Sequence, residues 1–323
     1  EHMMEILDTS SKQCKIVIQN GKKYVIRYRR KIGKTVEYYR STPEDEIIKI
    51  LQHYNVKCPK VLHVGKDYSV QEYIEGQLLS DKFVDHKEID RDIINQIVRE
   101  ICFLTSIDGN ELLQYASWNN NSSFYHFQCQ NTEKVFLEYY KKLKPIYDKL
   151  NISPEILAHL YNNTPKISDD RSLSVIHGDR HKKNAILADD GELTFIDWEL
   201  GCIGDVAYDI GFHLHHMAYT ESDEEYFLEQ LRKEFKGDTQ KLYSDIELYR
   251  IFLLARSTLY HVYWTDLVYQ GNNKVEMEKQ LGHFMRRYNK LSKYEYFKLQ
   301  PKSQDELNII FEEYRKHIEN SMR

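Results

Sequence analysis

The sequence predicts an α+β protein with two lobes: a small N-terminal lobe with an antiparallel sheet and one helix, and a larger, mainly helical C-terminal lobe. Residues 15–74 contain β-branched, alternating segments, whereas most of the later chain has helical periodicity. A single hairpin pattern at residues 185–196 interrupts the helices. We place the lobe boundary after Glu75, so that the lobes span residues 3–75 and 76–323.

The first two strands are expected around an Asn-Gly pair. Residues 15–19 and 22–27 flank Asn20-Gly21, which is the strongest signal for a two-residue hairpin turn. This turn places Arg27 opposite Cys14, at the end of an otherwise apolar strand face. Two further strands of the sheet are expected at residues 60–64 and 69–74.

A helix is expected to begin at Pro43, because a proline in the first turn followed by acidic residues is typical of a helix start. The apolar residues at 47–51 form one face of this helix, and Glu44 lies on the same face. A carboxylate that faces the core needs a cation, for which Arg27 is the candidate. Alternatively, Glu44 only completes a capping box with Ser41.

The later chain shows five periodic helical segments, and a β island lies among them. The hairpin consists of residues 185–188 and 192–196, on either side of Asp189-Asp190-Gly191. The helices are expected at residues 89–107, 136–150, 224–235, 242–269 and 306–318.

The residues that carry chemistry lie on both sides of this hairpin. If Asp190-Gly191 forms a two-residue turn, Asn184 lies opposite Asp197, and opposed residues have Cβ atoms about 4.5–5.5 Å apart. An amide oxygen and a carboxylate at this separation can share one Mg²⁺. Asp179, in the preceding loop, can approach a third group beside the metal. Phosphoryl transfer requires this arrangement, with metal-neutralised phosphates and a hydroxyl oriented by a carboxylate.

Three motifs resemble one family. They are His-Gly-Asp with a later Asn (177–184), Ile-Asp-Trp-Glu (196–199) and Gly-Asp followed by Asp-Ile (204–210). Together they resemble the aminoglycoside phosphotransferase and choline kinase superfamily, which are small-molecule kinases with a bilobal protein-kinase-like fold. The resemblance runs from about Ile6 to about Tyr269.

The resemblance implies an enzyme that uses ATP, or GTP in its place, with Mg²⁺ to phosphorylate a hydroxyl group of a small molecule. The implied acceptors are antibiotics such as aminoglycosides, or amino alcohols such as choline. In this chain the catalytic base would be Asp179, and the metal ligands would be Asn184 and Asp197. The lysine–glutamate pair of the family falls on Arg27 and Glu44, where arginine grips phosphate bidentately.

The resemblance also implies nucleotide contacts in the N-terminal lobe. The loop between the first two strands lacks glycine, and Ser10 and Ser11 are the expected phosphate contacts there. Residues 71–74 resemble the hinge of the family, where the backbone of Glu72 and Ile74 would contact the adenine edge.

Several of these residues also have simpler interpretations. Arg27 suits a solvated edge strand, and Asn184 and Asp197 suit turns and caps. The basic run at 180–183 either attracts phosphate or is a solvated loop, and the acidic run at 221–225 offers carboxylates for a polycationic acceptor.

Two helical faces raise further alternatives. Asp209, His213 and His216 share one face and could hold zinc, although such a face is more often packed or solvated, and the family uses this Asp to brace its catalytic loop. Tyr260, Tyr263 and Trp264 either line a pocket or belong to the core. The alternative function is a nucleotide-binding pseudokinase with a regulatory role; a helical interaction protein would require the hairpin motifs to be accidental.

The composition excludes the secreted, membrane-spanning and disulfide-rich classes of protein. The formal charge of −5 gives no reason to expect a nucleic-acid partner, and the short apolar stretches give none to expect a membrane partner. The five cysteines are odd in number and scattered, which favours reduced thiols in a cytoplasm. We expect a hydroxylated small molecule as the partner and make no prediction about oligomeric state. Glu1 and His2, before Met3, are taken as a cloning remnant.

Overall fold

The computed structural model describes four stretches of the chain, residues 5–7, 14–28, 44–107 and 173–270, and six single positions elsewhere. The chain divides into two compact units: Glu1–Gln130 with Asp169–Ile246, and Asn131–Ser168 with Glu247–Arg323. The elements and residues analysed below belong to the first unit, except the later part of the last long helix.

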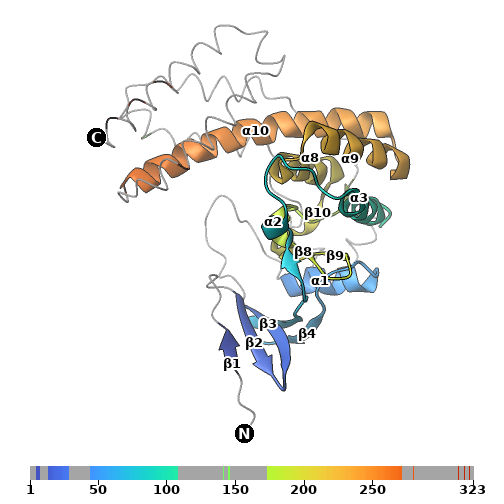
Figure 1. Ribbon diagram of the computed structural model, residues 1–323, viewed down its shortest axis with the longest axis vertical. Helices are drawn as coiled ribbons and strands as arrows, with labels where there is room; N and C mark the ends of the chain where they lie inside the picture. The colour runs from blue at the N-terminus through green and yellow to red at the C-terminus, as the bar shows by residue number, and fades with distance from the viewer. Residues whose placement is uncertain are drawn as a thin grey trace. The chain divides into compact units, whose positions relative to one another are not determined.

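The N-terminal part is a five-stranded antiparallel sheet with the strand order β1-β2-β3-β5-β4 (Figure 1). Asn20 and Gly21 have φ values of 52° and 74°, as the predicted tight turn requires, and Cys14 pairs with Arg27. The predicted hairpin and its register are therefore confirmed. The strands are β1 (Glu5–Leu7), β2 (Cys14–Gln19), β3 (Lys22–Tyr28), β4 (Val61–Val64) and β5 (Tyr68–Glu72).

Helix α1 (Glu44–His53) lies between β3 and β4 in the order of elements along the chain. Its three acidic residues occupy the first turn, at the positive end of the helix dipole. Ile47, Ile48 and Leu51 are buried, so the predicted apolar face is confirmed. The position of Pro43 lies outside the described residues.

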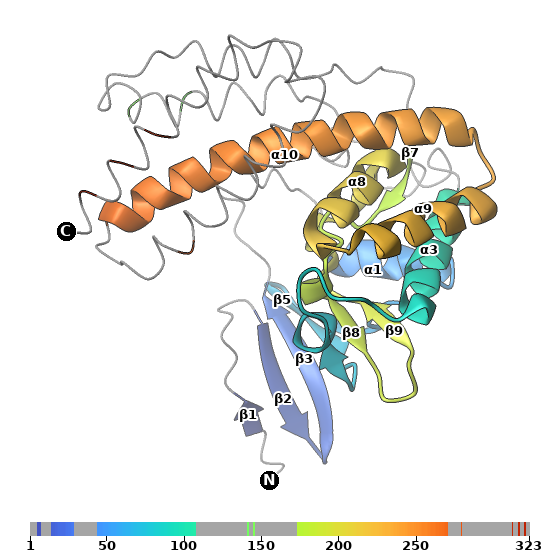
Figure 2. The same ribbon diagram turned by 45° about the horizontal axis from the view of Figure 1, so that its top comes forward.

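The rest of the described chain is mainly helical, with two small sheets. Strands β7 (Leu173–Ile176) and β10 (Cys202–Asp205) pair. A second sheet has the order β6-β8-β9, with β6 at Gln77–Leu78, β8 at Ala185–Leu187 and β9 at Leu193–Phe195. The helices are α2 (Leu79–Lys82), α3 (Arg91–Thr105), α8 (Val206–Met217), α9 (Glu221–Glu234) and α10 (Thr239–Gln270). Helices α3 and α9 lie side by side (Figures 1 and 2). None of the helices described is both long and apolar enough to cross a bilayer.

The hairpin that carries the motifs consists of β8 (Ala185–Leu187) and β9 (Leu193–Phe195), and its register differs from the prediction. Strand β6 (Gln77–Leu78) pairs with β8 on its other side. Ala185 pairs with Phe195, and the backbone N–H of Ile196 donates to the carbonyl of Asn184 at 2.8 Å. Asn184 therefore lies opposite Ile196 and not opposite Asp197.

The turn explains this difference, because it contains three residues instead of two. The N–H of Gly191 donates to the carbonyl of Ala188 at 3.0 Å, and the N–H of Ala188 donates to the carbonyl of Glu192 at 2.9 Å. Gly191 has a φ of 88°, and a left-handed glycine at this position is typical of three-residue hairpins. The two-residue turn predicted at Asp190-Gly191 is wrong, and Asp197 lies one residue beyond the partner of Asn184.

The other predicted elements of the described chain are found with shifts of a few residues at their ends. The helices predicted at residues 136–150 and 306–318 lie outside the described residues. Tyr260, Tyr263 and Trp264 lie on α10 where only the backbone is described, so the choice between a core and a pocket role for them stays open.

Candidate active site

The loop after β7 carries Asp179, and its backbone is held from helix α8. The carboxylate of Asp209 accepts hydrogen bonds from the N–H groups of His177 at 3.3 Å and Gly178 at 2.9 Å. Gly178 has a φ of 77°, which glycine adopts without strain. A buried carboxylate thus fixes the loop immediately before Asp179, as the resemblance implied for this residue of α8.

His177 connects this loop to the end of the hairpin. Its ring is fully buried, packs 4.4 Å from the ring of Trp198, and lies 3.0 Å through Nε2 from the carbonyl of Ile196. Burial lowers the pKa of His177 to about 4, so the ring is neutral at pH 7. The carbonyl requires Nε2 to carry the hydrogen, which leaves Nδ1 to accept from the N–H of Asp179 at 3.3 Å.

Asp179 is in direct contact with Asn184. The Nδ2 group of Asn184 donates to Asp179 Oδ2 at 2.9 Å and to the Asp179 carbonyl at 3.1 Å. His181 Nε2 lies 3.4 Å from the same Oδ2. Burial alone would raise the pKa of Asp179, but the contact with His181 outweighs it and lowers the pKa to about 2. Asp179 is therefore ionised at neutral pH and is ready to accept a hydrogen bond from a hydroxyl group.

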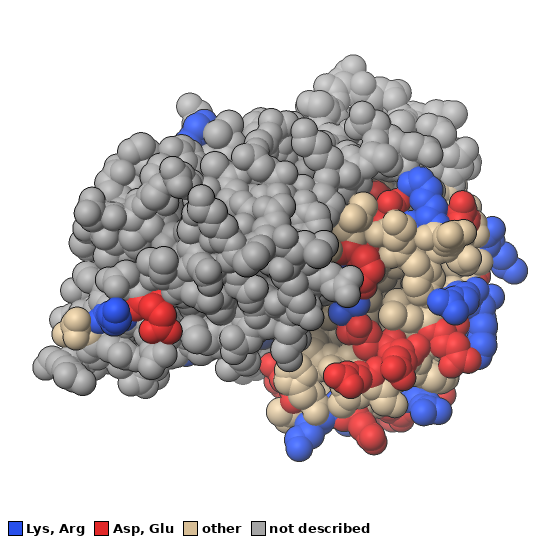
Figure 3. Space-filling model, turned by 90° about the horizontal axis from the view of Figure 1, so that it is seen from above, with Lys and Arg blue, Asp and Glu red and all other residues tan. Residues whose placement is uncertain are grey.

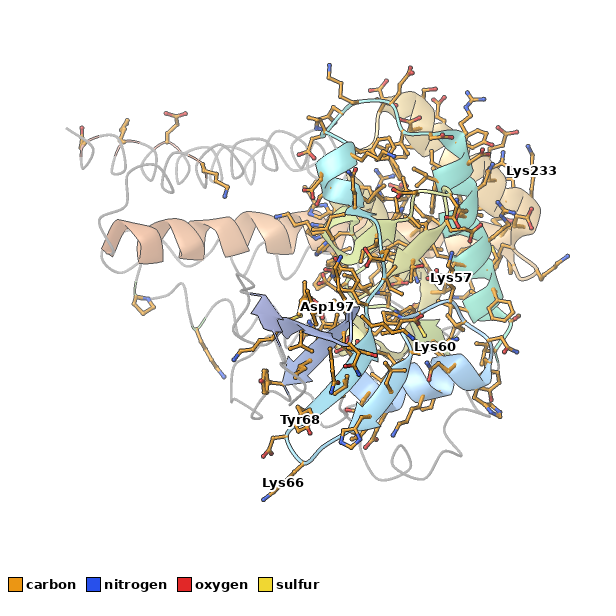
Figure 4. All side chains as sticks on the ribbon, turned by 60° about the horizontal axis from the view of Figure 1, so that its bottom comes forward. Lys57, Lys60, Lys66, Tyr68, Asp197 and Lys233 are labelled. Carbon is orange, nitrogen blue, oxygen red and sulfur yellow. The ribbon has the colours of Figure 1, made fainter. Side chains whose placement is uncertain are left out.

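Asp197 has an unusual backbone conformation directly after the hairpin. Its φ and ψ are 61° and 55°, in the left-handed region, and a short 3₁₀ helix (Trp198–Leu200) follows. Its Oδ1 forms an ion pair with Nη2 of Arg27 from β3, and Figure 4 shows Asp197 beside the N-terminal sheet. The loop therefore directs this carboxylate toward the strand that carries Arg27.

Arg27 is paired with two carboxylates. Its Nε donates to Glu44 Oε2 at 2.9 Å, and the side chain is mostly buried. Burial lowers the pKa of Arg27, but the charges of Glu44 and Asp197 outweigh this effect and raise it above its ordinary value. The predicted ion pair of Arg27 and Glu44 is confirmed, and neither the solvated position for Arg27 nor a capping role alone for Glu44 describes what is seen.

Glu44 has further partners. Its Oε1 accepts from the backbone N–H of Trp198 at 2.9 Å, and its Oε2 lies 3.3 Å from Nε2 of Gln71 on β5. This single carboxylate therefore connects α1, β3, β5 and the segment that carries Asp197. The contact with Trp198 was not predicted, because no local pattern relates positions so far apart in the chain.

The oxygen atoms present fit a hard divalent cation. Both hydrogen bonds of Asn184 use Nδ2, which leaves its Oδ1 for a cation, and Asp197 has a second carboxylate oxygen besides the one that contacts Arg27. Amide and carboxylate oxygens are the ligands that Mg²⁺ prefers. The assignment of Asn184 and Asp197 as the metal ligands stays a prediction.

The other predicted nucleotide contacts are less well defined. Glu72 is the last residue of β5, and its N–H donates to the carbonyl of Lys60 at 2.8 Å. Ile74 follows in the segment between β5 and β6 and is half-buried. Ser10 and Ser11 lie outside the described residues. The adenine and phosphate contacts of these four residues stay predictions.

The alternatives at the histidines and the acidic run have structural explanations. His213 is buried, with Nδ1 3.3 Å from the carbonyl of Arg180 and Nε2 2.9 Å from the hydroxyl of Tyr219, so both ring nitrogens are engaged. Asp223 is buried and accepts from the N–H of Ile89 at 3.2 Å. Figure 3 shows acidic side chains gathered on one face of the described surface. Asp223 of the 221–225 run is instead buried and holds the backbone of Ile89.

The residues of the basic run 180–183 have different surroundings. Lys182 forms an ion pair with Asp85, and Lys183 is exposed. Arg180, in contrast, is fully buried and contacts Glu100 of α3 and Asp209 of α8. The sequence did not indicate this cluster, because the partner on α3 is 80 residues away.

Comparisons with known proteins agree with this arrangement. A family model described as a phosphotransferase enzyme family matches residues 8–243. No curated protein sequence matches the chain. Among solved structures, an ethanolamine kinase from Plasmodium vivax is similar with a TM-score of 0.58 and 19% identity, over 89% of this chain and 81% of that one.

Two further structures are similar. A putative aminoglycoside phosphotransferase from Ralstonia eutropha JMP134 has a TM-score of 0.58 and 14% identity, over 98% of this chain and 94% of that one. A choline kinase from Cryptosporidium parvum Iowa II has a TM-score of 0.54 and 15% identity, over 89% and 90%. At these identities the structures establish the kinase-like fold, with an N-terminal antiparallel sheet and helix before a mainly helical part. Because the family model covers most of the sequence, the chain belongs to the phosphotransferase enzyme family.

Proposed function

We propose that the protein is a small-molecule kinase that transfers the γ-phosphate of ATP, bound with Mg²⁺, to a hydroxyl group of its acceptor. The observation that carries the proposal is the contact of Asp179 with Asn184, in the same unit as the ion pair of Arg27 with Glu44 and Asp197. Phosphoryl transfer needs a carboxylate that orients the acceptor hydroxyl, for which we propose Asp179. It also needs groups that bind the metal and the phosphates, for which we propose Asn184, Asp197 and Arg27.

In the proposed reaction, Asp179 orients the acceptor. Its ionised carboxylate accepts a hydrogen bond from the hydroxyl group, so that the oxygen points at the γ-phosphorus. The oxygen–phosphorus bond forms as the bond from the γ-phosphorus to the bridging oxygen of ADP breaks. We assign Asp179 mainly to orientation, and the hydroxyl proton passes to its carboxylate late, as the new oxygen–phosphorus bond forms.

The remaining residues bind and neutralise the phosphates. Asn184 and Asp197 would hold Mg²⁺, which neutralises the phosphate oxygens when it is bound. Arg27 provides a guanidinium that can grip a phosphate bidentately, and Glu44 keeps it in place. We assign nucleotide binding to the lobe of residues 3–75 and acceptor binding to residues 76–323.

The acceptor belongs to one of two chemical classes. The similar structures include kinases named for choline and ethanolamine and a protein named as a putative aminoglycoside phosphotransferase. We therefore propose an amino alcohol or a hydroxylated antibiotic as the acceptor. Among the described residues, Cys58 and Cys102 form no disulfide bond, which is consistent with a reducing compartment such as the cytoplasm.

The test is a panel of acceptors with ATP or GTP and Mg²⁺. Choline, ethanolamine and several aminoglycosides would be incubated separately with the protein, and phosphorylated product would be identified by mass spectrometry. We expect one class to be phosphorylated, and Asp179→Asn to abolish the product. Tight binding of Mg·ATP without phosphorylation of any acceptor, across a broad panel of hydroxylated compounds, would instead favour a nucleotide-binding pseudokinase.

A further inference from the structure

Arg180 directly follows Asp179 in the sequence, but its side chain lies in the interior. It is fully buried, whereas the side chain of Asp179 remains partly exposed. A buried arginine is costly unless its charge and its N–H groups find partners. The contacts of Arg180 therefore indicate which groups its side chain holds in place.

Three elements converge on the guanidinium group of Arg180. Its Nη1 donates to Glu100 Oε1 of α3 at 2.8 Å, and its Nε donates to Asp209 Oδ2 of α8 at 3.0 Å. The guanidinium also lies 4.4 Å from the ring centroid of Phe195 at the end of β9. Among the described residues, Nη2 has no hydrogen-bond partner.

The partner Asp209 is also the residue that holds the loop of Asp179. The same Oδ2 that accepts from Arg180 accepts from the N–H of His177, and Oδ1 accepts from the N–H of Gly178. In addition, the carbonyl of Arg180 lies 3.3 Å from Nδ1 of His213. The guanidinium thus fixes the orientation of the carboxylate that fixes the loop.

The charges of the cluster explain why an arginine is needed. Burial raises the pKa of Glu100, and the charge of Arg180 opposes this effect. Burial would raise the pKa of Asp209 as well, but there the charge of Arg180 prevails and the pKa is lowered. His177 is neutral at pH 7, so one guanidinium faces two carboxylates, and with both of them ionised the cluster has a formal charge of −1. Without Arg180 these carboxylates would repel each other beside the catalytic loop.

We propose that Arg180 is a positioning residue for phosphoryl transfer: together with Glu100 it holds Asp209, and through it the loop of Asp179, in the orientation that the reaction requires. This inference rests on the proposed function. It assigns to Arg180 an effect mainly on the chemical step and a smaller one on the binding of Mg·ATP, because Arg27 and Asp197 lie outside the cluster, whereas Asn184 contacts Asp179.

The variant that separates positioning from stability is Arg180→Met combined with Glu100→Met. The single change Arg180→Met leaves two unbalanced carboxylates, whereas the double change removes one positive and one negative charge and keeps the formal charge of the cluster unchanged. Buried ion pairs can often be replaced by apolar residues of similar volume without loss of stability. We expect the double variant to melt close to the wild type while kcat falls about 100-fold, because a small misplacement of a reacting group has this effect.

The affinity for Mg·ATP, measured by calorimetry, is expected to stay within a few-fold of the wild type in the double variant, a much smaller change than that in kcat. Arg180→Lys keeps the charge but not the planar fork, so it should recover part of the lost kcat and provides a second variant if the first does not fold. Arg99→Met is the matched control, because Arg99 is exposed on the same helix as Glu100. It should change neither kcat nor the melting temperature.

Amide hydrogen exchange provides a readout that needs no acceptor. The amides of His177 and Gly178 should exchange about tenfold faster in the double variant, while those of α9 stay unchanged. A double variant with wild-type kcat, or with wild-type exchange at Gly178, overturns the positioning role. A failure of the proposed function is visible separately, because the wild type would then phosphorylate no acceptor.

Discussion

The carboxylate of Glu44 accepts a hydrogen bond from the backbone N–H of Trp198 at 2.9 Å. Trp198 directly follows Asp197, so a residue of α1 holds the backbone beside a proposed metal ligand. The same carboxylate holds Arg27. The position of the phosphate-binding cation and that of the metal ligand therefore depend on one side chain.

Glu44→Gln tests this dependence. The variant keeps the shape of the side chain but loses the charge that holds Arg27, and hydrogen bonds to charged groups are each worth about 1.5–3 kcal/mol. We expect the affinity for Mg·ATP, measured by calorimetry, to fall about 10- to 100-fold. Glu46→Gln on the same helix is the control and should bind as the wild type does. Equal affinities of the two variants would contradict the role of Glu44.

Arg27→Lys and Arg27→Met distinguish charge from geometry. Lysine keeps the charge but cannot bridge Glu44 and Asp197 with a planar fork, so we expect about a tenfold rise in KM for ATP. Methionine leaves the two carboxylates without their cation, and the rise should be about 100-fold or more. Steady-state kinetics at saturating acceptor measure both. If lysine and methionine behave alike, the charge of Arg27 is not what binds the phosphates.

The two buried histidines predict a loss of stability in acid. Burial lowers the pKa of His177 to about 4 and that of His213 to about 3, from an ordinary value of 6.5. As the pH falls below 6.5, the unfolded chain takes up protons that the folded protein does not. The free energy of unfolding should therefore decrease by about 1.4 kcal/mol per pH unit for each histidine between pH 6.5 and about 4.

Urea unfolding at several pH values measures this slope. The variant His213→Gln should have a slope that is smaller by about 1.4 kcal/mol per pH unit, because one of the two groups is removed. His63→Gln, on the exposed side of β4, should keep the wild-type slope. A slope that does not change in His213→Gln would show that His213 is not neutral in the folded protein.

Two glycines test the hairpin and the segment before it. Gly191 has a φ of 88° and open space around it, so Gly191→Ala should cost about 1 kcal/mol from backbone strain alone. Gly76 has a φ of 146°, and an added Cβ would lie 2.4 Å from the carbonyl oxygen of Leu187. Gly76→Ala should therefore cost about 2–4 kcal/mol in thermal or urea unfolding. The ranking is the critical result, and equal costs would contradict the packing of this segment on β8.

Local signals explain which parts of the fold could be predicted. The Asn20-Gly21 pair determines both the turn and the register of β2 and β3, and the predicted register is the one observed. In the second hairpin, Asp189-Asp190-Gly191 permits two turns of different length. The choice depends on where the left-handed glycine lies, and a difference of one residue moves Asn184 from Asp197 to Ile196.

The contacts of the candidate site also divide into those that could be predicted from the sequence and those that could not. The pair of Arg27 and Glu44 could be predicted, because strand and helix periodicity indicate which face each residue occupies. The cluster of Arg180 and Glu100 could not, since it depends on how α3 packs against the catalytic loop. In the sequence, Arg180 is only the first residue of a basic run.

The comparison of Asp179→Asn with Asp197→Asn tests the central claim most directly. Calorimetry with Mg·ATP and turnover of the identified acceptor would be measured for both variants. If Asp179 orients the hydroxyl and Asp197 binds the metal, Asp179→Asn binds Mg·ATP as the wild type does and loses about 1000-fold or more in kcat, whereas Asp197→Asn loses the binding itself. Turnover by Asp179→Asn within a few-fold of the wild type, or unchanged Mg·ATP binding by Asp197→Asn, would contradict the account.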